Sequence, residues 1–176
     1  MAQGSEPRLV LVDAHDRPVG VGEKLAVHRE GLLHRAFSVY VVDPSGRSML
    51  QRRAASKYHS AGRWSNACCG HPREGESVRA AAERRLREEM GLACDLEQVG
   101  VVAYRLVLEN GLIENEIDHV LVGRSSETPR PDPAEVDAWR LATDEEIDRE
   151  LREAPERYTP WFPLVRAAVR RGEGSS

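Results

Sequence analysis

The sequence is poor in lysine, in cysteine and in long apolar segments. Only two of its 25 basic residues are lysines, Lys24 and Lys57. The three cysteines are odd in number and two are adjacent, which is a poor disulfide framework and fits a reducing compartment. Apolar runs such as residues 36–42 are far shorter than the roughly 20 residues that cross a membrane. These shortages argue against a secreted or membrane-spanning protein.

The chain also lacks a basic surplus and an amino-terminal signal. Its formal net charge is -4, from 25 basic and 29 acidic residues, whereas a dedicated nucleic-acid binder carries excess positive charge. No basic segment followed by an apolar one occurs in residues 1–10, as a secretory signal would require. We therefore expect a cytoplasmic protein that acts as a monomer, with neither nucleic acid nor a membrane as partner.

A length of 176 residues corresponds to one domain. Runs of β-branched and aromatic residues predict strands, and apolar residues spaced by three or four predict helices. Hairpins mixed with helices predict an α/β (more narrowly α+β) fold, a mixed β-sheet flanked by helices, over residues 9–171, with loose tails at 1–8 and 172–176. We expect strands at 9–12, 36–42, 48–52, 99–108, 114–122 and 136–141, helices at 77–90, 144–152 and 161–171, and loops at 58–72 and 128–133.

Two short segments carry reactive side chains. Cys69 and His71 lie two residues apart in a loop rich in glycine and proline, where both could point into one cleft. Glu114 and Glu116 are predicted to share one face of a strand, about 7 Å apart at their Cα atoms. Two neighbouring carboxylates repel each other unless a cation lies beside them. A buried thiol and a solvated acidic face are the alternatives at these two places.

Histidines upstream extend this pattern. Imidazole is a common neutral metal ligand, although each histidine alone could be an ordinary surface residue. Three imidazoles and two carboxylates suit a divalent transition ion better than Mg²⁺, and they differ from a closed structural zinc site. The possible ligand set is His28, His34, His71, Glu114 and Glu116.

A longer motif runs from Gly70 to Leu92. It contains Gly70, Glu76 six residues later, and then the run Arg84-Arg85-Leu86-Arg87-Glu88-Glu89-Met90-Gly91-Leu92. This motif resembles a Nudix box, in which helix carboxylates hold the divalent ions that activate water on a diphosphate. Arg85 stands where the Nudix pattern has glutamate. The resemblance therefore implies a Nudix fold with a damaged hydrolytic metal cluster, in which Arg85 pairs with Glu88 and Glu89 or binds a phosphate.

The further motifs resemble one branch of that superfamily, the type 1 isopentenyl diphosphate isomerases. The similarity extends over roughly residues 9–165. It includes the segments Ala26-Val27-His28, His34-Arg35-Ala36-Phe37-Ser38, Gln51-Arg52-Arg53-Ala54, Trp64-Ser65-Asn66, Cys69-Gly70-His71-Pro72, Glu114-Asn115-Glu116 and Tyr158-Thr159-Pro160-Trp161. This resemblance implies an enzyme that interconverts isopentenyl and dimethylallyl diphosphate in isoprenoid biosynthesis, by protonation and deprotonation through a carbocation-like species.

The resemblance also implies roles for individual residues. Cys69 and Glu116 are the opposed proton-transfer pair, Tyr104 assists the acid, and the π face of Trp161 stabilises the cation. The diphosphate is bound by Lys24, Arg53, Lys57 and Arg85, so both lysines of the chain lie at expected phosphate contacts. The five-residue set named above holds one Mn²⁺, Zn²⁺ or Fe²⁺ ion, and Glu89 holds Mg²⁺ that bridges to the diphosphate. No dinucleotide-binding signature occurs, which fits a flavin-independent enzyme.

Two other functions deserve comparison. A Nudix hydrolase of a nucleoside or other diphosphate would explain the helix motif, but Arg85 argues against it and Cys69 would have no use. A non-catalytic binding module with a Nudix fold predicts that some acid, base or metal positions are lost, whereas all are present. The sequence thus favours the isomerase.

Overall fold

The computed structural model describes residues 8–173, so residues 1–7 and 174–176 lie outside the described part of the chain. The expected tails at 1–8 and 172–176 fall mostly there. The first strand, β1 (Arg8–Val12), starts at Arg8, and the last helix, α4 (Phe162–Glu173), ends at Glu173. Among residues 8–173, no helix is both long and apolar enough to span a bilayer.

The fold is built around one strand, β3 (His34–Val42), which lies at the centre of a mixed, nine-stranded sheet. β3 pairs in parallel with β8 (Ile113–Arg124), which forms a long antiparallel hairpin with β7 (Leu96–Val107). It pairs antiparallel with β1, with β4 (Ser48–Arg53) and with β6 (Cys68–Gly70). The sheet is completed by β2 (Pro18–Glu23) on β1, and by β5 (Trp64–Ser65) and β9 (Val136–Ala142) on β4.

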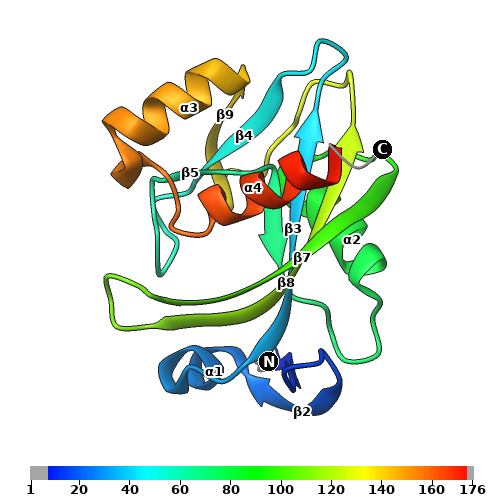
Figure 1. The fold of residues 1–176 in the computed structure, drawn as a ribbon, viewed down its shortest axis with the longest axis vertical. Coiled ribbons are helices and arrows are strands. Elements are labelled where there is room, and N and C mark those ends of the chain that lie inside the picture. The colour runs from blue at the N-terminus through cyan, green and yellow to red at the C-terminus, as the bar shows by residue number, and fades with distance from the viewer. Residues whose placement is uncertain (1–7, 174–176) are drawn as a thin grey trace, which may run out of the picture.

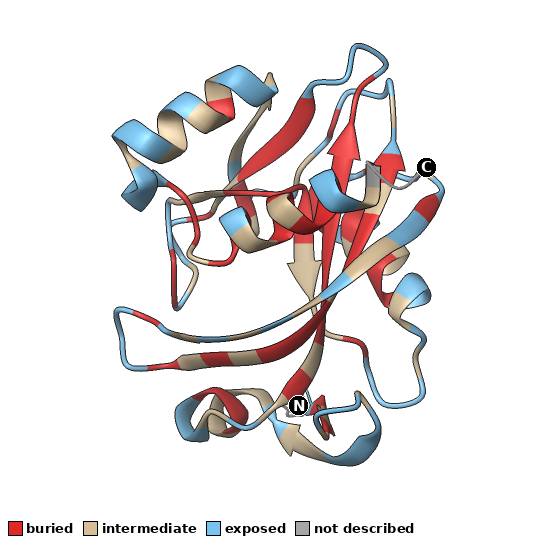
Figure 2. Ribbon diagram, viewed as in Figure 1, coloured by how far each residue is buried: buried red, intermediate tan, exposed pale blue. Residues whose placement is uncertain are grey.

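Both faces of β3 are buried. Phe37, Val39 and Val41 pack on one side with residues of α2 (Val78–Met90), whereas Tyr40 and Val42 pack on the other side with residues of α4. Successive strand residues point to opposite faces, so a strand with apolar residues on both faces suits a sheet covered by helices on both sides. Figures 1 and 2 show this arrangement, with buried residues along the central strands and exposed residues on the outer surface of α3 (Asp144–Glu153).

The Nudix-like helix α2 begins and ends where the sequence predicts. The Ser77 side chain accepts a hydrogen bond from the Ala80 backbone N–H, which satisfies one free donor of the first turn. Gly91 terminates the helix at φ 63°, a left-handed conformation that glycine adopts without steric cost. Leu86 and Met90 are buried on one face, so the opposite face is left for charged residues.

Several short elements were not predicted. The region 58–72 is not all loop, because it contains β5 and β6. The helix α1 (Lys24–Glu30), the strand β2 and a 3₁₀ turn at Pro155–Arg157 were also missed. The other predicted strands and helices are confirmed within a few residues at their ends. The mixed sheet with flanking helices confirms the predicted fold class.

Candidate active site

The predicted metal ligands come from four separate segments and meet at one end of the β3–β8 pair. His28 lies in α1, His34 begins β3, His71 follows β6, and Glu114 and Glu116 lie on β8. In the register of the parallel pair, His34 lies opposite Glu116. One potential ligand atom from each of the five residues lies within 4.8 Å of the others. The structure thus brings together all five residues of the predicted set.

Hydrogen bonds orient the imidazoles of this cluster. The Nδ1 atoms of His28 and His34 lie 2.6 Å and 2.9 Å from the backbone carbonyl oxygens of Lys24 and Leu32, so these nitrogens carry the protons. Their Nε2 atoms point to carboxylates, at 3.1 Å from Glu114 Oε2 and 3.2 Å from Glu116 Oε1. This arrangement, with the outer nitrogen bound to a carbonyl, is typical of histidines that bind metals. The donor set therefore fits a divalent transition ion.

Glu116 is at the centre of this hydrogen-bond network. His71 Nε2 lies 2.9 Å from its Oε1, and the Tyr104 hydroxyl donates to its Oε2 over 2.5 Å. Burial alone would raise the pKa of Glu116, but the His34 and Tyr104 contacts lower it below its usual value. Burial raises the pKa of Tyr104 well above 10, and the nearby Asp118 and Glu116 carboxyls act in the same direction. Tyr104 therefore stays protonated and donates a hydrogen bond to the Glu116 carboxylate.

Cys69 lies opposite Ser38 in the β3–β6 pair, next to this network. Its Sγ is 3.2 Å from Asn66 Nδ2 and 3.6 Å from Ser38 Oγ. Burial raises the pKa of Cys69 to about 12, so the side chain is a protonated thiol at neutral pH. The neighbouring Cys68 is completely buried and packs in the core on the α2 side.

Asp118 lies between Ser38, which is beside Cys69, and Tyr104, which is beside Glu116. It is not among the site residues predicted from the sequence. Its Oδ2 accepts a hydrogen bond of 2.8 Å from Ser38 and lies 3.2 Å from the Tyr104 hydroxyl. Burial raises the pKa of Asp118 well above its usual value, and the charge of Glu116 adds to this shift. Among the described residues, Asp118 Oδ1 has no hydrogen-bond partner. Its position two residues after Glu116, on the same face of the strand, was the available sequence signal.

A pocket of about 740 Å³ opens onto these groups. Its wall contains Cys69 and Glu116, which are the predicted proton-transfer pair, together with Tyr104 and Trp161. The predicted phosphate contacts also line it, namely Lys24, Arg53, Lys57 and Arg85. Burial lowers the pKa of Lys24, while the charge of Glu114 opposes this shift. Positive charge and proton-transfer groups thus share one pocket.

Arg85 binds the acids beside it. Its guanidinium donates to Glu88 Oε2 over 2.7 Å and to Glu89 Oε1 over 2.5 Å, and lies 3.3 Å from Glu135. The other Glu89 oxygen accepts a hydrogen bond of 2.9 Å from Gln51. Glu135, which also pairs with Lys57, was not predicted because it follows a proline-rich loop with no motif. The acidic end of α2 is therefore neutralised by arginine.

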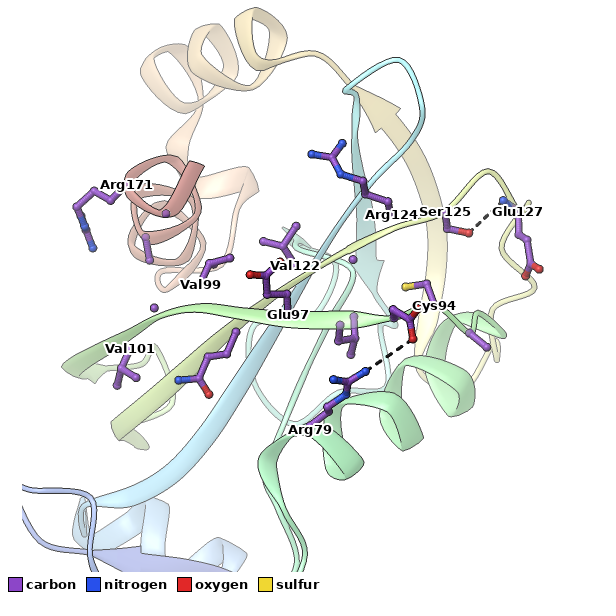
Figure 3. A pocket seen from close by; sticks show the side chains of 18 of the residues that line it. Arg79, Cys94, Glu97, Val99, Val101, Val122, Arg124, Ser125, Glu127 and Arg171 are labelled. Carbon is purple, nitrogen blue, oxygen red and sulfur yellow. Dashed lines mark hydrogen bonds and ion pairs between the residues drawn. The ribbon is translucent and has the colours of Figure 1, made fainter. Parts of the chain in front are cut away.

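A second and larger concavity, of about 1150 Å³, lies elsewhere on the molecule (Figure 3). It is formed by β7, β8 and the last turn of α4, and it contains Cys94 and the pair Arg79–Asp95, 3.7 Å apart. None of the predicted site residues lines it. The smaller pocket is the candidate active site, because buried titratable groups converge there.

Comparison with known proteins agrees with this geometry. Residues 32–162 match the NUDIX domain family. Two solved structures share the fold: DR0079 from Deinococcus radiodurans has a TM-score of 0.77 at 20% identity, covering 92% of this chain and 98% of the other. A MutT NUDIX hydrolase from Burkholderia pseudomallei has a TM-score of 0.62 at 22% identity, covering 78% and 98%. The fold and the α2 motif thus define a NUDIX domain.

Proteins that are similar in sequence indicate a narrower family within the NUDIX domain proteins. A protein from Burkholderia multivorans is 52% identical over 157 residues, which is 89% of each chain, and is named isopentenyl-diphosphate Delta-isomerase. Proteins of the same name from Serratia proteamaculans and Nocardia farcinica are 49% and 48% identical, over 89% and 88% of this chain and 88% and 90% of theirs. The chain belongs to the isopentenyl-diphosphate Delta-isomerase family, as the sequence motifs predict.

Proposed function

We propose that this protein interconverts isopentenyl and dimethylallyl diphosphate by adding a proton to the substrate and removing another. The observation that carries the proposal is a single pocket that holds a half-buried thiol, a buried carboxylate and four cationic side chains. The membership of the chain in the isomerase family supports the same reaction. The substrate is thus a small diphosphate.

The reaction needs two proton-exchanging groups. The alkene takes up a proton at one carbon, which leaves a tertiary cation, and a proton then leaves another carbon, so the net proton count is zero. Cys69 and Glu116 are the two groups we assign to these transfers, with Tyr104 donating to Glu116. Because the reaction is reversible, the group that acts as the acid in one direction acts as the base in the other.

The remaining pocket residues bind the substrate and shield the cation. Lys24, Arg53, Lys57 and Arg85 supply the positive charge that a diphosphate requires. The Trp161 ring is almost completely buried and faces the Arg53 guanidinium, whose central carbon is 5.5 Å from the ring centre. An aromatic face stabilises a cation by about 0.5–2 kcal/mol, while an apolar wall keeps water away from it.

The His28–His34–His71–Glu114–Glu116 cluster fits one Mn²⁺, Zn²⁺ or Fe²⁺ ion. Such an ion, when bound, would supply positive charge beside Glu116 and favour its carboxylate form. Mg²⁺ at Glu89 remains a prediction, because Arg85 and Gln51 already bind that carboxylate and the diphosphate would have to supply further oxygen ligands. No step that we assign to Cys69 or Tyr104 requires a flavin.

The hydrolase alternative is not favoured, because Arg85 neutralises the helix acids that a hydrolase would use for metal binding. Monomeric state, a cytoplasmic location and the absence of nucleic-acid partners remain predictions from the sequence. The decisive experiment incubates the purified protein with isopentenyl diphosphate and Mg²⁺ and follows dimethylallyl diphosphate and free phosphate together. Formation of the isomer without phosphate release is expected, and steady phosphate release would instead support hydrolysis.

A further inference from the structure

His59 is a buried histidine that neither the sequence motifs nor the proposed reaction uses. It lies in the segment between β4 and β5, whose ends are joined by hydrogen bonds of 2.9 Å between Arg53 and Arg63 and between Gly62 and Arg53. Contacts with the β7–β8 turn hold the segment in place: Ser60 N–H donates to Glu109 over 3.1 Å, and Asn110 Nδ2 donates to the Tyr58 carbonyl over 2.8 Å. The segment that carries His59 is thus fixed both at its own ends and by the β7–β8 turn.

The imidazole faces the carboxylate of a candidate metal ligand. His59 Nε2 is 3.3 Å from Glu114 Oε1, while the other oxygen, Glu114 Oε2, faces His28 Nε2 at 3.1 Å. The second ring nitrogen of His59, Nδ1, lies 3.5 Å from the Ser60 hydroxyl. These partners are consistent with one tautomer, in which Nε2–H donates to Glu114 and Nδ1 accepts from Ser60. Glu114 is therefore held between two imidazoles, of which only His28 belongs to the five-residue cluster.

The same ring contacts the substrate-binding part of the pocket. It meets Trp161 edge to face, with the ring centres 5.8 Å apart. The backbone carbonyl of His59 accepts a hydrogen bond of 3.2 Å from Arg53 Nη2. One residue therefore touches a candidate metal ligand, the aromatic wall and a candidate phosphate contact.

We infer that His59 is a positioning residue that fixes the Glu114 carboxylate for metal binding and couples its placement to that of Trp161. The inference rests on the ligand set assigned under the proposed function. Residues that hydrogen-bond to metal ligands from outside typically change metal affinity by about 10–100-fold when removed. The Nε2–H of His59 restricts rotation of the carboxylate, while its ring edge fixes the Trp161 plane.

Two substitutions separate the hydrogen bond from the ring. His59→Gln places an amide N–H near the position of Nε2 but removes the ring, whereas His59→Phe keeps the ring contact with Trp161 and removes the donor. His119→Phe is a matched control, because His119 forms a histidine–carboxylate pair with Asp16 at 2.8 Å outside the pocket. Ser60→Ala, a milder change, removes only the hydroxyl beside Nδ1.

The test measures the Mn²⁺ dissociation constant of chelator-stripped protein by competition with a fluorescent indicator, together with tryptophan emission and urea unfolding. We expect His59→Phe to weaken Mn²⁺ binding about 10–100-fold and His59→Gln to stay within about threefold of the parent. Ser60→Ala should also weaken Mn²⁺ binding, by less than His59→Phe. His119→Phe should bind Mn²⁺ as the parent does. The tryptophan emission should change in His59→Gln more than in His59→Phe.

Two results would overturn the inference: parental Mn²⁺ affinity in His59→Phe, or an equally large loss in His59→Gln. If His59→Phe does not fold, parental affinity in Ser60→Ala overturns it. Failure of the parent protein itself to bind Mn²⁺ would instead refute the five-residue ligand set, and this inference with it. Isomerase activity is measured separately, so loss of the proposed reaction is distinguishable from loss of metal binding.

Discussion

Two groups of glutamates in this molecule have opposite surroundings. On α2 and the loop before it, Glu76, Glu88 and Glu89 lie 2.5–2.8 Å from arginine nitrogens of Arg84 and Arg85. On β8, Glu114 and Glu116 lie 2.9–3.3 Å from histidine nitrogens. All five acids are glutamates, and the two groups have different partners.

The partner determines what the acids can bind. Guanidinium is always charged, donates all its hydrogens and has no lone pair to offer, so an acid that it binds is neutralised. Imidazole can offer a lone pair, so an acid beside it becomes part of a shared ligand set. In this NUDIX domain the helix acids are neutralised, and the candidate metal ligands lie at one end of the central β3–β8 pair.

The largest expected effect comes from removing a proton-transfer group that the sheet carries. Cys69→Ala and Glu116→Gln should each lower kcat by about 10²–10⁴-fold, because each removes one of two groups that exchange protons with substrate. Cys68→Ala is the control and should have a small effect, since Cys68 lies in the core away from the pocket. The rate of dimethylallyl diphosphate formation is the measurement. An inactive Cys68→Ala and an active Cys69→Ala would show that the wrong cysteine has been assigned.

The next largest effect is expected when a candidate metal ligand is replaced by alanine. His71→Ala and Glu114→Ala should lower transition-metal occupancy and activity together, with a loss of affinity of at least about 10-fold. Elemental analysis after gentle purification measures occupancy, and we expect about one ion per chain in the parent. His15→Ala, on an exposed turn, should bind the parental amount of metal. Full loading of a variant that lacks both His71 and Glu114 side chains would refute the assignment.

Arg85→Glu tests the helix side directly. The substitution restores the NUDIX-type acid and leaves Glu88, Glu89 and Glu135 without their shared cation. We expect a loss of about 1–3 kcal/mol in the free energy of unfolding without metal, because a partly buried ion pair becomes a repulsive cluster. Mg²⁺ should recover part of that loss, since oxygen ligands now face one another. Urea unfolding with and without Mg²⁺ measures both effects. Arg87→Glu serves as the control, because Arg87 is an exposed residue of α2 that does not line the pocket.

The smallest expected effect concerns the aromatic wall. Trp161→Phe keeps a negative π face, whereas Trp161→Leu keeps only an apolar surface, so kcat should be about 2–30-fold lower in the leucine variant than in the phenylalanine variant. The comparison is made in kcat, because stabilisation of the cation acts in the transition state. Equal kcat values in the two variants would refute the cation-stabilising role of Trp161.

The elements with long, regular patterns could be predicted from the sequence. The helix α2 has a capping serine, a four-residue apolar spacing and a terminal glycine, and each feature favours the same boundaries. The strand β3 is apolar from Ala36 to Val42 except at Ser38, which is typical of a central strand. The helix α1 spans only seven residues, too few for a clear periodicity, and β5 and β6 span two and three.

The site was predictable where chemistry and spacing coincide. His71 and Glu116 belong to short motifs, whereas His59 and Glu135 reach the pocket only through strand register and loop closure. Neither has a neighbour in sequence that indicates its role. Register between distant segments depends on packing across the whole sheet, so such residues emerge only from the folded structure.

The environment of Cys69 also has a consequence for the chemical durability of the protein. Burial raises the pKa of this thiol to about 12, so almost none of it is thiolate at neutral pH. Alkylating agents and peroxides react with the thiolate, so its scarcity slows both kinds of damage. Asn66 and Ser38 hold the sulfur in place without making it a strong nucleophile. We therefore expect Cys69 to react more slowly with alkylating agents and peroxides than a cysteine that is ionised at neutral pH.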